Sequence, residues 1–324
     1  MNWQDTFPDT NKYWHTDEGI LYNANNLQIL KKIPANSIDI VITSPPYWSL
    51  RDYGISNQIG LEETTAKYLH KLWKIFDEIK RILKPTGTIW INMGDTYSGS
   101  GKGVGGDGSA KERWAFKKRP LIHEDIPRKS LHMIPKRFAI GMIERGWTLR
   151  NQIIWHKPNA MPTSAKDRFT VDFEKIFFFT KNPKYYFKQI LEPVKESSLK
   201  RAQYKYNAKK TNFAINLQTN NDSIGRRLTK PEGRNKRTTW SISTKSYKGN
   251  HSAVFPPDIP RICIEAGCPM EPDSIVLDPF LGSGTTAMVA REFNRRWIGI
   301  ELNPKYCKLA RRRLQNNNLV KFLI

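Results

Sequence analysis

The chain has 324 residues, of which 39% are hydrophobic, and a formal net charge of +23. This length suits one large domain, or one domain with an insert, and the absence of any run of about 18 apolar residues argues against a membrane span. No secretory pattern opens the chain and its three cysteines match neither a disulfide framework nor a zinc site, so we expect a cytoplasmic, metal-free protein whose positive charge attracts a polyanion such as nucleic acid.

The first strongly apolar segment, residues 38–43, is predicted to be a buried strand that ends at Ser44-Pro45-Pro46-Tyr47. Prolines lack an N–H and fix φ, so the strand cannot continue and the chain leaves the sheet as a stiff bracket. Ligands of open α/β sheets bind at such strand ends. The carbonyls of Ser44 and Pro45 and the ring of Tyr47 suit a planar heterocycle with an exocyclic amine. A strand end capped by proline with no chemistry is the alternative.

The middle of the chain is predicted to be mostly scaffold. Apolar periodicity and turn residues predict helices over residues 64–83 and 130–145 and strands over 88–93, 147–155 and 173–180. Between them, the glycine-rich segment 98–109 is either a lid beside the bracket or a plain insertion.

Two basic stretches are candidates for contact with a nucleic acid. The first, residues 157–169, contains Lys166 and Arg168. The second, residues 195–250, has 14 basic and three acidic residues, with amide, hydroxyl and aromatic side chains between them. Lysines meet phosphates, and amides and guanidiniums read base edges. The candidates in the second stretch are Arg226, Arg227, Arg234, Lys236 and Arg237. Solvated surface charge, or a disordered basic linker, is the alternative.

A second ligand site is predicted near the C-terminus. Strand 274–278 is followed by a turn with Gly282 and Gly284, then by a helix over residues 285–293 and a strand, 296–301, that ends at Glu301. Such a β-loop-α-β unit binds an adenosine, with glycines beneath the ligand and an acid for the ribose hydroxyls. The dinucleotide and P-loop fingerprints are absent. Asp278 suits an ammonium group, which favours S-adenosylmethionine over a phosphate ligand.

Ser44-Pro45-Pro46-Tyr47 and Asp278-Pro279-Phe280-Leu281-Gly282-Ser283-Gly284-Thr285 resemble the two signature motifs of DNA amino-methyltransferases. Their order, with the catalytic motif first, resembles the β-group of this family. Residues 90–95, 155–158 and 251–257 are also similar to family segments. Asn25 stands where the family often has an aspartate that contacts the adenine of the cofactor.

The resemblance implies an α/β fold of the Rossmann-like methyltransferase type, with a mixed, mostly parallel sheet, helices on both faces and a circularly permuted motif order. It implies a catalytic half in residues 1–194, a DNA target-recognition region in residues 195–250 and a half that binds S-adenosyl-L-methionine in residues 251–324. The implied catalytic residues are Ser44, Pro45, Pro46 and Tyr47. The implied cofactor contacts are Asn25, Phe255, Asp278, Pro279, Phe280, Gly282, Gly284, Thr285 and Glu301.

Ser44 at the first position of the catalytic motif is usual for enzymes of this family that methylate the N4 amine of cytosine. We therefore expect a prokaryotic or phage enzyme that flips a cytosine out of double-stranded DNA and methylates it. A separate restriction endonuclease is an expected companion, and the enzyme is expected to be a monomer or a homodimer. Adenine-N6 methylation, an RNA or protein methyltransferase and an inactive DNA-binding relative are the alternatives.

Overall fold

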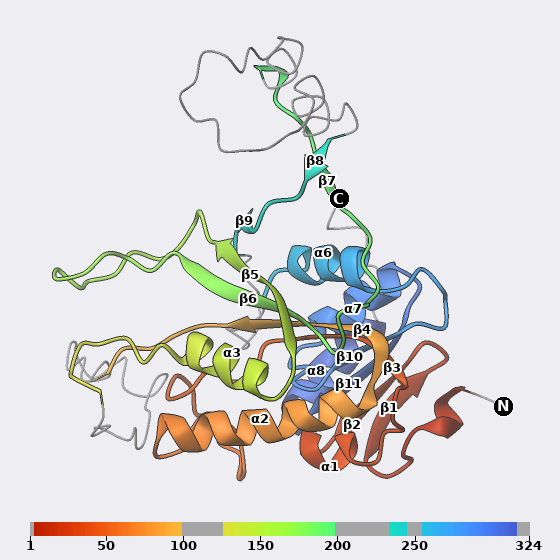
Figure 1. Cartoon of the computed structure of the whole chain (residues 1–324). Helices are drawn as coiled ribbons and strands as arrows, with labels where there is room; N and C mark the ends of the chain where they lie inside the picture. Colours follow the sequence, from red (N-terminus) through yellow and green to blue (C-terminus); the bar gives the residue numbers. More distant parts are fainter. Residues whose placement is uncertain (1–2, 99–125, 198–232, 245–254, 316–324) are drawn as a thin grey trace. The chain divides into compact units, whose positions relative to one another are not determined.

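The computed structural model describes residues 3–98, 126–197, 233–244 and 255–315 (Figure 1). Its contacts divide the chain into two units, one formed by Met1–Phe187 with Thr238–Ile324 and the other by Lys188–Arg237. Nearly all of the glycine-rich segment 98–109 and most of the basic stretch 195–250 lie outside the described residues.

Within the described part of the larger unit, nine strands form one sheet in the order β1-β2-β11-β10-β3-β4-β6-β5-β9. The strands β2, β11, β10, β3 and β4 are mutually parallel, whereas β6 is antiparallel to both β4 and β5. Their bounds are β1 Lys12–Thr16, β2 Gly19–Asn23, β3 Ile38–Thr43, β4 Leu83–Met93, β5 Thr148–His156, β6 Phe173–Thr180, β9 Thr239–Ser241, β10 Ile275–Asp278 and β11 Arg296–Glu301. The expected mixed, mostly parallel sheet is confirmed.

Helices cover both faces of this sheet, with α2 and α3 on one side and α6 and α7 on the other (Figure 1). Their bounds are η1 Trp3–Thr6, α1 Asn26–Leu30, α2 Thr65–Ile82, α3 Ile134–Glu144, α6 Asp258–Gly267, α7 Thr285–Glu292 and α8 Pro304–Gln315. Helix α2 begins where the Thr64 hydroxyl accepts a hydrogen bond from the N–H of Lys67 at 3.2 Å. It buries an apolar face that includes Leu69, Leu72 and Phe76.

The central strand β3 is buried along its whole length, as a strand covered on both faces must be. Its one acid, Asp39, accepts hydrogen bonds from Lys84 Nζ at 2.8 and 2.9 Å and from the N–H of Ile275 at 2.9 Å. Because Lys84 belongs to β4 and Ile275 to β10, this carboxylate ties the central strand to both neighbours. Asp39 lies near the amino end of β3, and this tie also fixes the position of the carboxyl end of the strand, where Ser44 follows.

The smaller unit contains a short antiparallel pair, β7 (Leu191–Glu192) and β8 (Arg234–Asn235). Around Glu192 lie three of the basic residues predicted to bind DNA. Arg234, Lys236 and Arg237 approach its carboxylate to 3.6, 3.7 and 3.4 Å. The proposed target-recognition region 195–250 overlaps this unit but has different bounds, and it remains a prediction.

Two further observations concern the described residues as a set. None of the helices there is long and apolar enough to cross a membrane, and no three metal-ligating side chains gather there. Cys263, Cys268 and Cys307 are free and buried, and burial raises the thiol pKa of Cys268 and of Cys307 to about 12. These thiols therefore pack as small apolar groups.

Candidate active site

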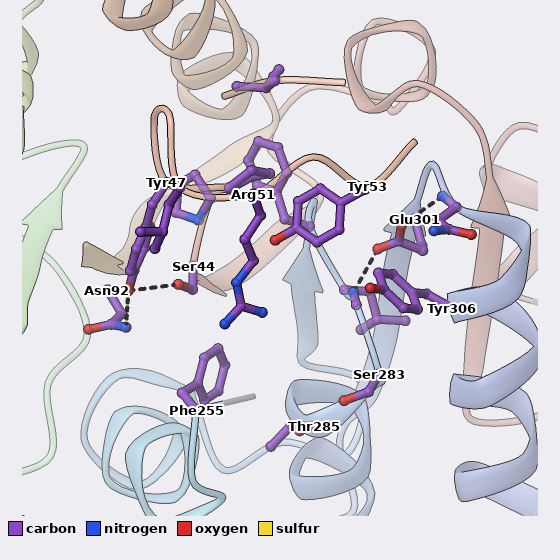
Figure 2. A pocket seen from close by; sticks show the side chains of 18 of the residues that line it. Ser44, Tyr47, Arg51, Tyr53, Asn92, Phe255, Ser283, Thr285, Glu301 and Tyr306 are labelled. Carbon is purple, nitrogen blue, oxygen red and sulfur yellow. Dashed lines mark hydrogen bonds between the residues drawn. The ribbon is translucent and has the colours of Figure 1, made fainter. Parts of the chain in front are cut away.

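The two sequence motifs meet at the carboxyl ends of the neighbouring strands β3 and β10. Val41 and Leu277 are partners in this parallel pair, and the Thr43 hydroxyl donates a hydrogen bond of 2.7 Å to Asp278. Residues of both motifs line one cavity of about 980 Å³ (Figure 2). Thr43 and Asp278, 235 positions apart in the chain, are therefore in direct contact.

One wall of the cavity is formed by the turn after β10, by the ends of β2 and β11 and by Phe255 before α6; we call it the cofactor wall. Seven of the predicted cofactor contacts line it: Asn25, Phe255, Pro279, Phe280, Gly282, Thr285 and Glu301. Gly282 has a φ of 56°, a left-handed conformation that glycine adopts readily. This conformation turns the glycine N–H toward the carboxylate of Glu301, which it meets at 2.8 Å.

Glu301 is the acidic group of the cofactor wall. One carboxylate oxygen accepts the N–H of Gly282 and the other accepts the N–H of Asn303 at 2.7 Å. Burial raises the pKa of this carboxyl to about 7, against the opposing effect of the two backbone donors. Because a carboxylate has about four acceptor positions, it can still accept hydrogen bonds from a diol in the cavity.

Asn25 lines the same wall beside α1. Its side-chain oxygen accepts the N–H of Leu27 at 3.0 Å and caps the helix. The amide nitrogen is then the group available to a ligand, and it can donate to a ring nitrogen.

Asp278 and Gly284, both predicted cofactor contacts, are not among the residues that line the cavity, and their contact with the cofactor stays a prediction. Asp278 is 2% exposed; one of its oxygens accepts from Thr43 and from the N–H of Phe280, and the other from the Thr286 hydroxyl. Burial raises its pKa to about 6. In this structure the acid therefore holds the turn together.

Gly284 begins α7 with a φ of 86°. A Cβ at this position would lie 3.2 Å from the Cβ of Ala310 in α8. The glycine is needed for the turn and for close helix packing.

The opposite wall of the cavity, which we call the target wall, contains Ser44, Pro45, Pro46 and Tyr47. The Pro46 carbonyl accepts a hydrogen bond from the Tyr68 hydroxyl at 2.8 Å, which anchors the bracket to α2. Among the described residues, no backbone N–H donates to the Pro45 carbonyl. Trp48 is 2% exposed, and its indole N–H donates to a backbone carbonyl at 2.9 Å. It belongs to the core and offers no second ring to a ligand.

The Tyr47 hydroxyl is held by a network of side chains. It donates to one oxygen of Glu174, and Asn92 Nδ2 lies 2.9 Å from the phenol oxygen and 2.7 Å from the same Glu174 oxygen. The other oxygen of Glu174 pairs with the Lys157 ammonium. Ser44 Oγ lies 3.4 Å from the phenol oxygen (Figure 2). Burial, followed by the neighbouring Glu174, raises the pKa of Tyr47 well above its usual value, so the phenol keeps its proton.

The sequence reasoning did not identify Asn92, Lys157 or Glu174 as site residues. Asn92 ends β4, Lys157 follows β5 and Glu174 begins the antiparallel β6, so all three reach the same edge of the sheet. The segments 90–95 and 155–158, which resemble family segments, were the available signal for two of them. Glu174 is the one acid in a strand that has four phenylalanines and an isoleucine, which could have marked it.

The loop after the target wall also lines the cavity and was not predicted. It includes Arg51, which reaches into the cavity (Figure 2), and Tyr53. The rings of Tyr53 and Tyr306 pack edge to face, with centroids 6.0 Å apart. The loop therefore runs from the target wall to the cofactor wall.

The residues predicted to bind DNA are more dispersed. Lys166 and Arg168 are exposed on the loop between β5 and β6, and the Arg168 guanidinium lies 3.7 Å from the centre of the Tyr97 ring. Arg226 and Arg227 lie outside the described residues. Arg234, Lys236 and Arg237 belong to the smaller unit and share Glu192, as described above.

Comparison with known proteins agrees with this geometry. A family model described as DNA methylase, for N6 and N4 methyltransferases, matches residues 38–312. The chain is 39% identical over 300 residues to the type II methyltransferase M.XycI of Xanthomonas campestris pv. cyanopsidis, covering 92% of this chain and 88% of that protein. It is 40% identical over 298 residues to the type II methyltransferase M.Cfr9I of Citrobacter freundii, with the same coverage.

Solved structures show the same fold. The PvuII DNA methyltransferase, described as cytosine-N4-specific, superposes with a TM-score of 0.64 at 21% identity, over 96% of this chain and 91% of that one. A DNA modification methylase of Thermus thermophilus, solved with S-adenosyl-L-methionine, gives a TM-score of 0.54 at 22% identity, over 91% of this chain and 92% of that one. With two motifs on one cavity and a family model that spans most of the sequence, the chain belongs to the N6/N4 family of DNA methylases, enzymes that use S-adenosyl-L-methionine as methyl donor.

Proposed function

We propose that this enzyme methylates the exocyclic N4 amine of a cytosine that is flipped out of duplex DNA. The observation that carries the proposal is the target wall: the Ser44 hydroxyl, the Pro45 carbonyl and the Tyr47 ring line the same cavity as the cofactor wall. Two acceptors beside a ring suit a planar base with an NH₂ group. Inside a stacked duplex this amine is out of reach of a donor bound in a cavity, so the base must leave the stack.

The residues of the target wall would activate the amine by orientation and by their dipoles. Tyr47 stacks on the base, and Ser44 Oγ with the Pro45 carbonyl accepts the two amine hydrogens. These bonds localise the nitrogen lone pair, which the ring otherwise withdraws, and they aim it toward the cofactor wall. The chemistry requires no covalent enzyme intermediate, in keeping with the three buried, protonated cysteines.

The cofactor wall has donors and acceptors that fit S-adenosyl-L-methionine, which supplies an electrophilic methyl group when bound. Glu301 would accept the ribose hydroxyls, and the Asn25 amide would donate to an adenine ring nitrogen. Phe255 and Phe280 line the wall with apolar surface. Arg51, a cation within the same cavity, would pair with the methionine carboxylate.

The choice of cytosine over adenine rests on Ser44 at the head of the bracket. Its hydroxyl is short and neutral, and it suits the small pyrimidine edge, whereas an aspartate suits the adenine edge. The PvuII enzyme, whose fold is similar, is described as cytosine-N4-specific, which supports the same choice.

For the partners we propose double-stranded DNA, with phosphate contacts from Lys166 and Arg168 and base recognition by the region 195–250. This region includes the basic residues Arg226, Arg227, Arg234, Lys236 and Arg237. A restriction endonuclease that acts separately would cut the same DNA recognition sequence when that sequence is unmethylated. We expect the enzyme to act as a monomer or a homodimer.

Nucleoside analysis tests the base assignment directly. Purified enzyme is incubated with plasmid DNA and labelled S-adenosylmethionine, and the DNA is then digested to nucleosides. We expect the label in N4-methylcytosine. Label in N6-methyladenine alone would contradict the assignment. Mapping the methylated positions in the plasmid gives the recognition sequence.

A further inference from the structure

The Tyr47 hydroxyl has three hydrogen-bonding neighbours but only one proton, which fixes the direction of every bond around it. The Glu174 oxygen beside it has no hydrogen to give, because the same carboxylate pairs with the Lys157 ammonium. The phenol proton must therefore point to Glu174. The other two neighbours, Asn92 and Ser44, are then left with the lone pairs of the phenol oxygen and must donate.

Asn92 is consistent with this direction. Its side-chain nitrogen lies 2.9 Å from the phenol oxygen and 2.7 Å from Glu174. A carboxylate oxygen attracts an N–H and repels a carbonyl oxygen, so the amide nitrogen must occupy this position. The amide oxygen points away and, within the described part of the chain, it is buried without a partner.

Ser44 is the last member of the chain of hydrogen bonds. Its hydroxyl hydrogen points to the phenol oxygen, 3.4 Å away, and its lone pairs are left to face the cavity. We propose that Glu174, acting through Tyr47, fixes the Ser44 hydroxyl as a hydrogen-bond acceptor and so makes the site select an amine over a carbonyl at the reacting position. This inference rests on the proposed function, and it names Glu174 and Lys157 as positioning residues.

Lys157 is what prevents Glu174 from adopting another orientation. Its ammonium pairs with the carboxylate oxygen that Tyr47 does not use, and it lies 4.5 Å from the centre of the Trp155 ring. Both partners are largely buried, with side chains 20% and 16% exposed. An ammonium group can only donate, so the group it holds must present an acceptor to it.

This constraint predicts that Glu174→Gln reverses the whole chain of bonds. The glutamine oxygen must face Lys157, which turns its NH₂ toward Tyr47. The phenol then accepts from the glutamine and donates to Ser44, and Ser44 donates into the cavity. Asn92 can follow by rotating its amide, since its oxygen has no partner to lose. The cavity would now present a donor where the native enzyme presents an acceptor.

Uracil tests this reversal, because it carries a carbonyl oxygen where cytosine carries the amine. Two duplexes are compared, each with the recognition sequence and with either cytosine or uracil at the target position. Their dissociation constants are measured for each variant with S-adenosylhomocysteine present. The uracil-to-cytosine ratio of dissociation constants is compared between each variant and the native enzyme. This comparison cancels the effect of the uracil mismatch on the DNA itself.

We expect the preference for cytosine over uracil, expressed as the ratio of the two dissociation constants, to be roughly 10-fold or more larger in the native enzyme than in Glu174→Gln. The reason is that a buried donor facing a donor is costly. Methyl transfer to cytosine should fall roughly 100-fold in Glu174→Gln, with little change in cofactor affinity. Tyr47→Phe, which keeps the ring and removes the relay, should lower the preference without reversing it.

Glu292→Gln is the matched control, because Glu292 also forms a partly buried ion pair, with Arg261 at 2.7 Å, but lies outside the residues that line the cavity. It should keep the native preference and rate. An unchanged preference in Glu174→Gln, or a native rate in Tyr47→Phe, would overturn the proposal. If the native enzyme proves to methylate adenine, the cytosine assignment alone fails, and adenine with hypoxanthine replaces the two bases in the same test.

Discussion

The two walls of the cavity are held in place by different means. On the cofactor wall, Glu301 is held by backbone N–H groups, those of Gly282 in the turn after β10 and of Asn303 just after β11. On the target wall, Tyr47 is held by side chains from other strands, among them Asn92 and Glu174. Damage to the first wall should therefore appear in cofactor affinity, and damage to the second in the rate of methyl transfer.

The largest effect is expected for Tyr47→Ala. It removes both the stacking ring and the hydroxyl that connects Ser44 to Glu174, so single-turnover methyl transfer should fall about 1000-fold. The dissociation constant for S-adenosylmethionine, measured by calorimetry, should stay within a factor of two or so, a change of under about 0.5 kcal/mol. A variant that methylates as well as the native enzyme would refute the role of the ring.

Gly94→Ala should displace the Tyr47 ring of the target wall without removing any hydrogen-bonding or charged side chain. A Cβ at Gly94 would lie 2.5 Å from Cε2 of Tyr47, so the ring must move away from the end of β4. A misplacement of this size should cost about 100-fold in rate, again at unchanged cofactor affinity. Equal rates for this variant and the native enzyme would mean that the position of the ring matters little.

Glu301→Gln should act on the cofactor wall instead. Loss of the charged acceptor for the ribose hydroxyls should weaken S-adenosylmethionine binding about 30-fold, or roughly 2 kcal/mol. In the native enzyme the free carboxyl has a pKa of about 7, and hydroxyl donors favour its ionised form. Affinity should therefore rise as pH rises from about 6 to 8, and this rise should be absent in the variant. A native affinity that falls over this range would contradict the role.

Arg51→Ala tests the loop that runs between the two walls. Loss of the cation should weaken S-adenosylmethionine binding about 10-fold. Methylthioadenosine has no carboxylate, and its affinity should not change. If both ligands lose affinity equally, Arg51 supports the shape of the loop and does not pair with the carboxylate.

Asp278→Asn should have the smallest effect on binding, because Asp278 holds the turn and does not line the cavity. One of its three hydrogen bonds is weakened, so the free energy of unfolding should fall by about 1 kcal/mol. Burial raises the folded pKa of Asp278 from 3.8 to about 6, so its contribution to stability is greatest below about pH 3.8 and falls as pH rises through 6. The variant should lack this pH dependence. A large loss of cofactor affinity would restore direct contact as the explanation.

The same comparison explains how far the sequence could predict the site. The cofactor turn and the proline bracket are each contiguous in the chain, and apolar strands next to glycine or proline identify them without a structure. The family resemblance implied that both motifs belong to one enzyme, but the pairing of their strands, β3 and β10, was not predicted. The roles of Asp278 and Gly284 were not determined either, because the same acid and glycine could either touch a ligand or hold a turn.

The side chains that support Tyr47 on the target wall were not predicted from the sequence. Asn92, Lys157 and Glu174 come from three strands, and only the antiparallel placement of β6 between β4 and β5 brings them to Tyr47. Two of them lie in segments that resemble family segments and Glu174 is the one acid of its strand, but neither feature shows that the three side chains meet. The helices and strands predicted between residues 38 and 180 were found close to their expected bounds, but which strands would be neighbours was not predicted.

The central claim is that the bracket and the cofactor turn act on one base in one cavity. A crystal structure of the enzyme with S-adenosylhomocysteine and a duplex containing the recognition sequence tests it most directly. The claim predicts a flipped cytosine on Tyr47, with its N4 about 3 Å from both Ser44 Oγ and the Pro45 oxygen and facing the cofactor sulfur. A target base bound outside this cavity, or held with its amine turned away from Ser44, would contradict it.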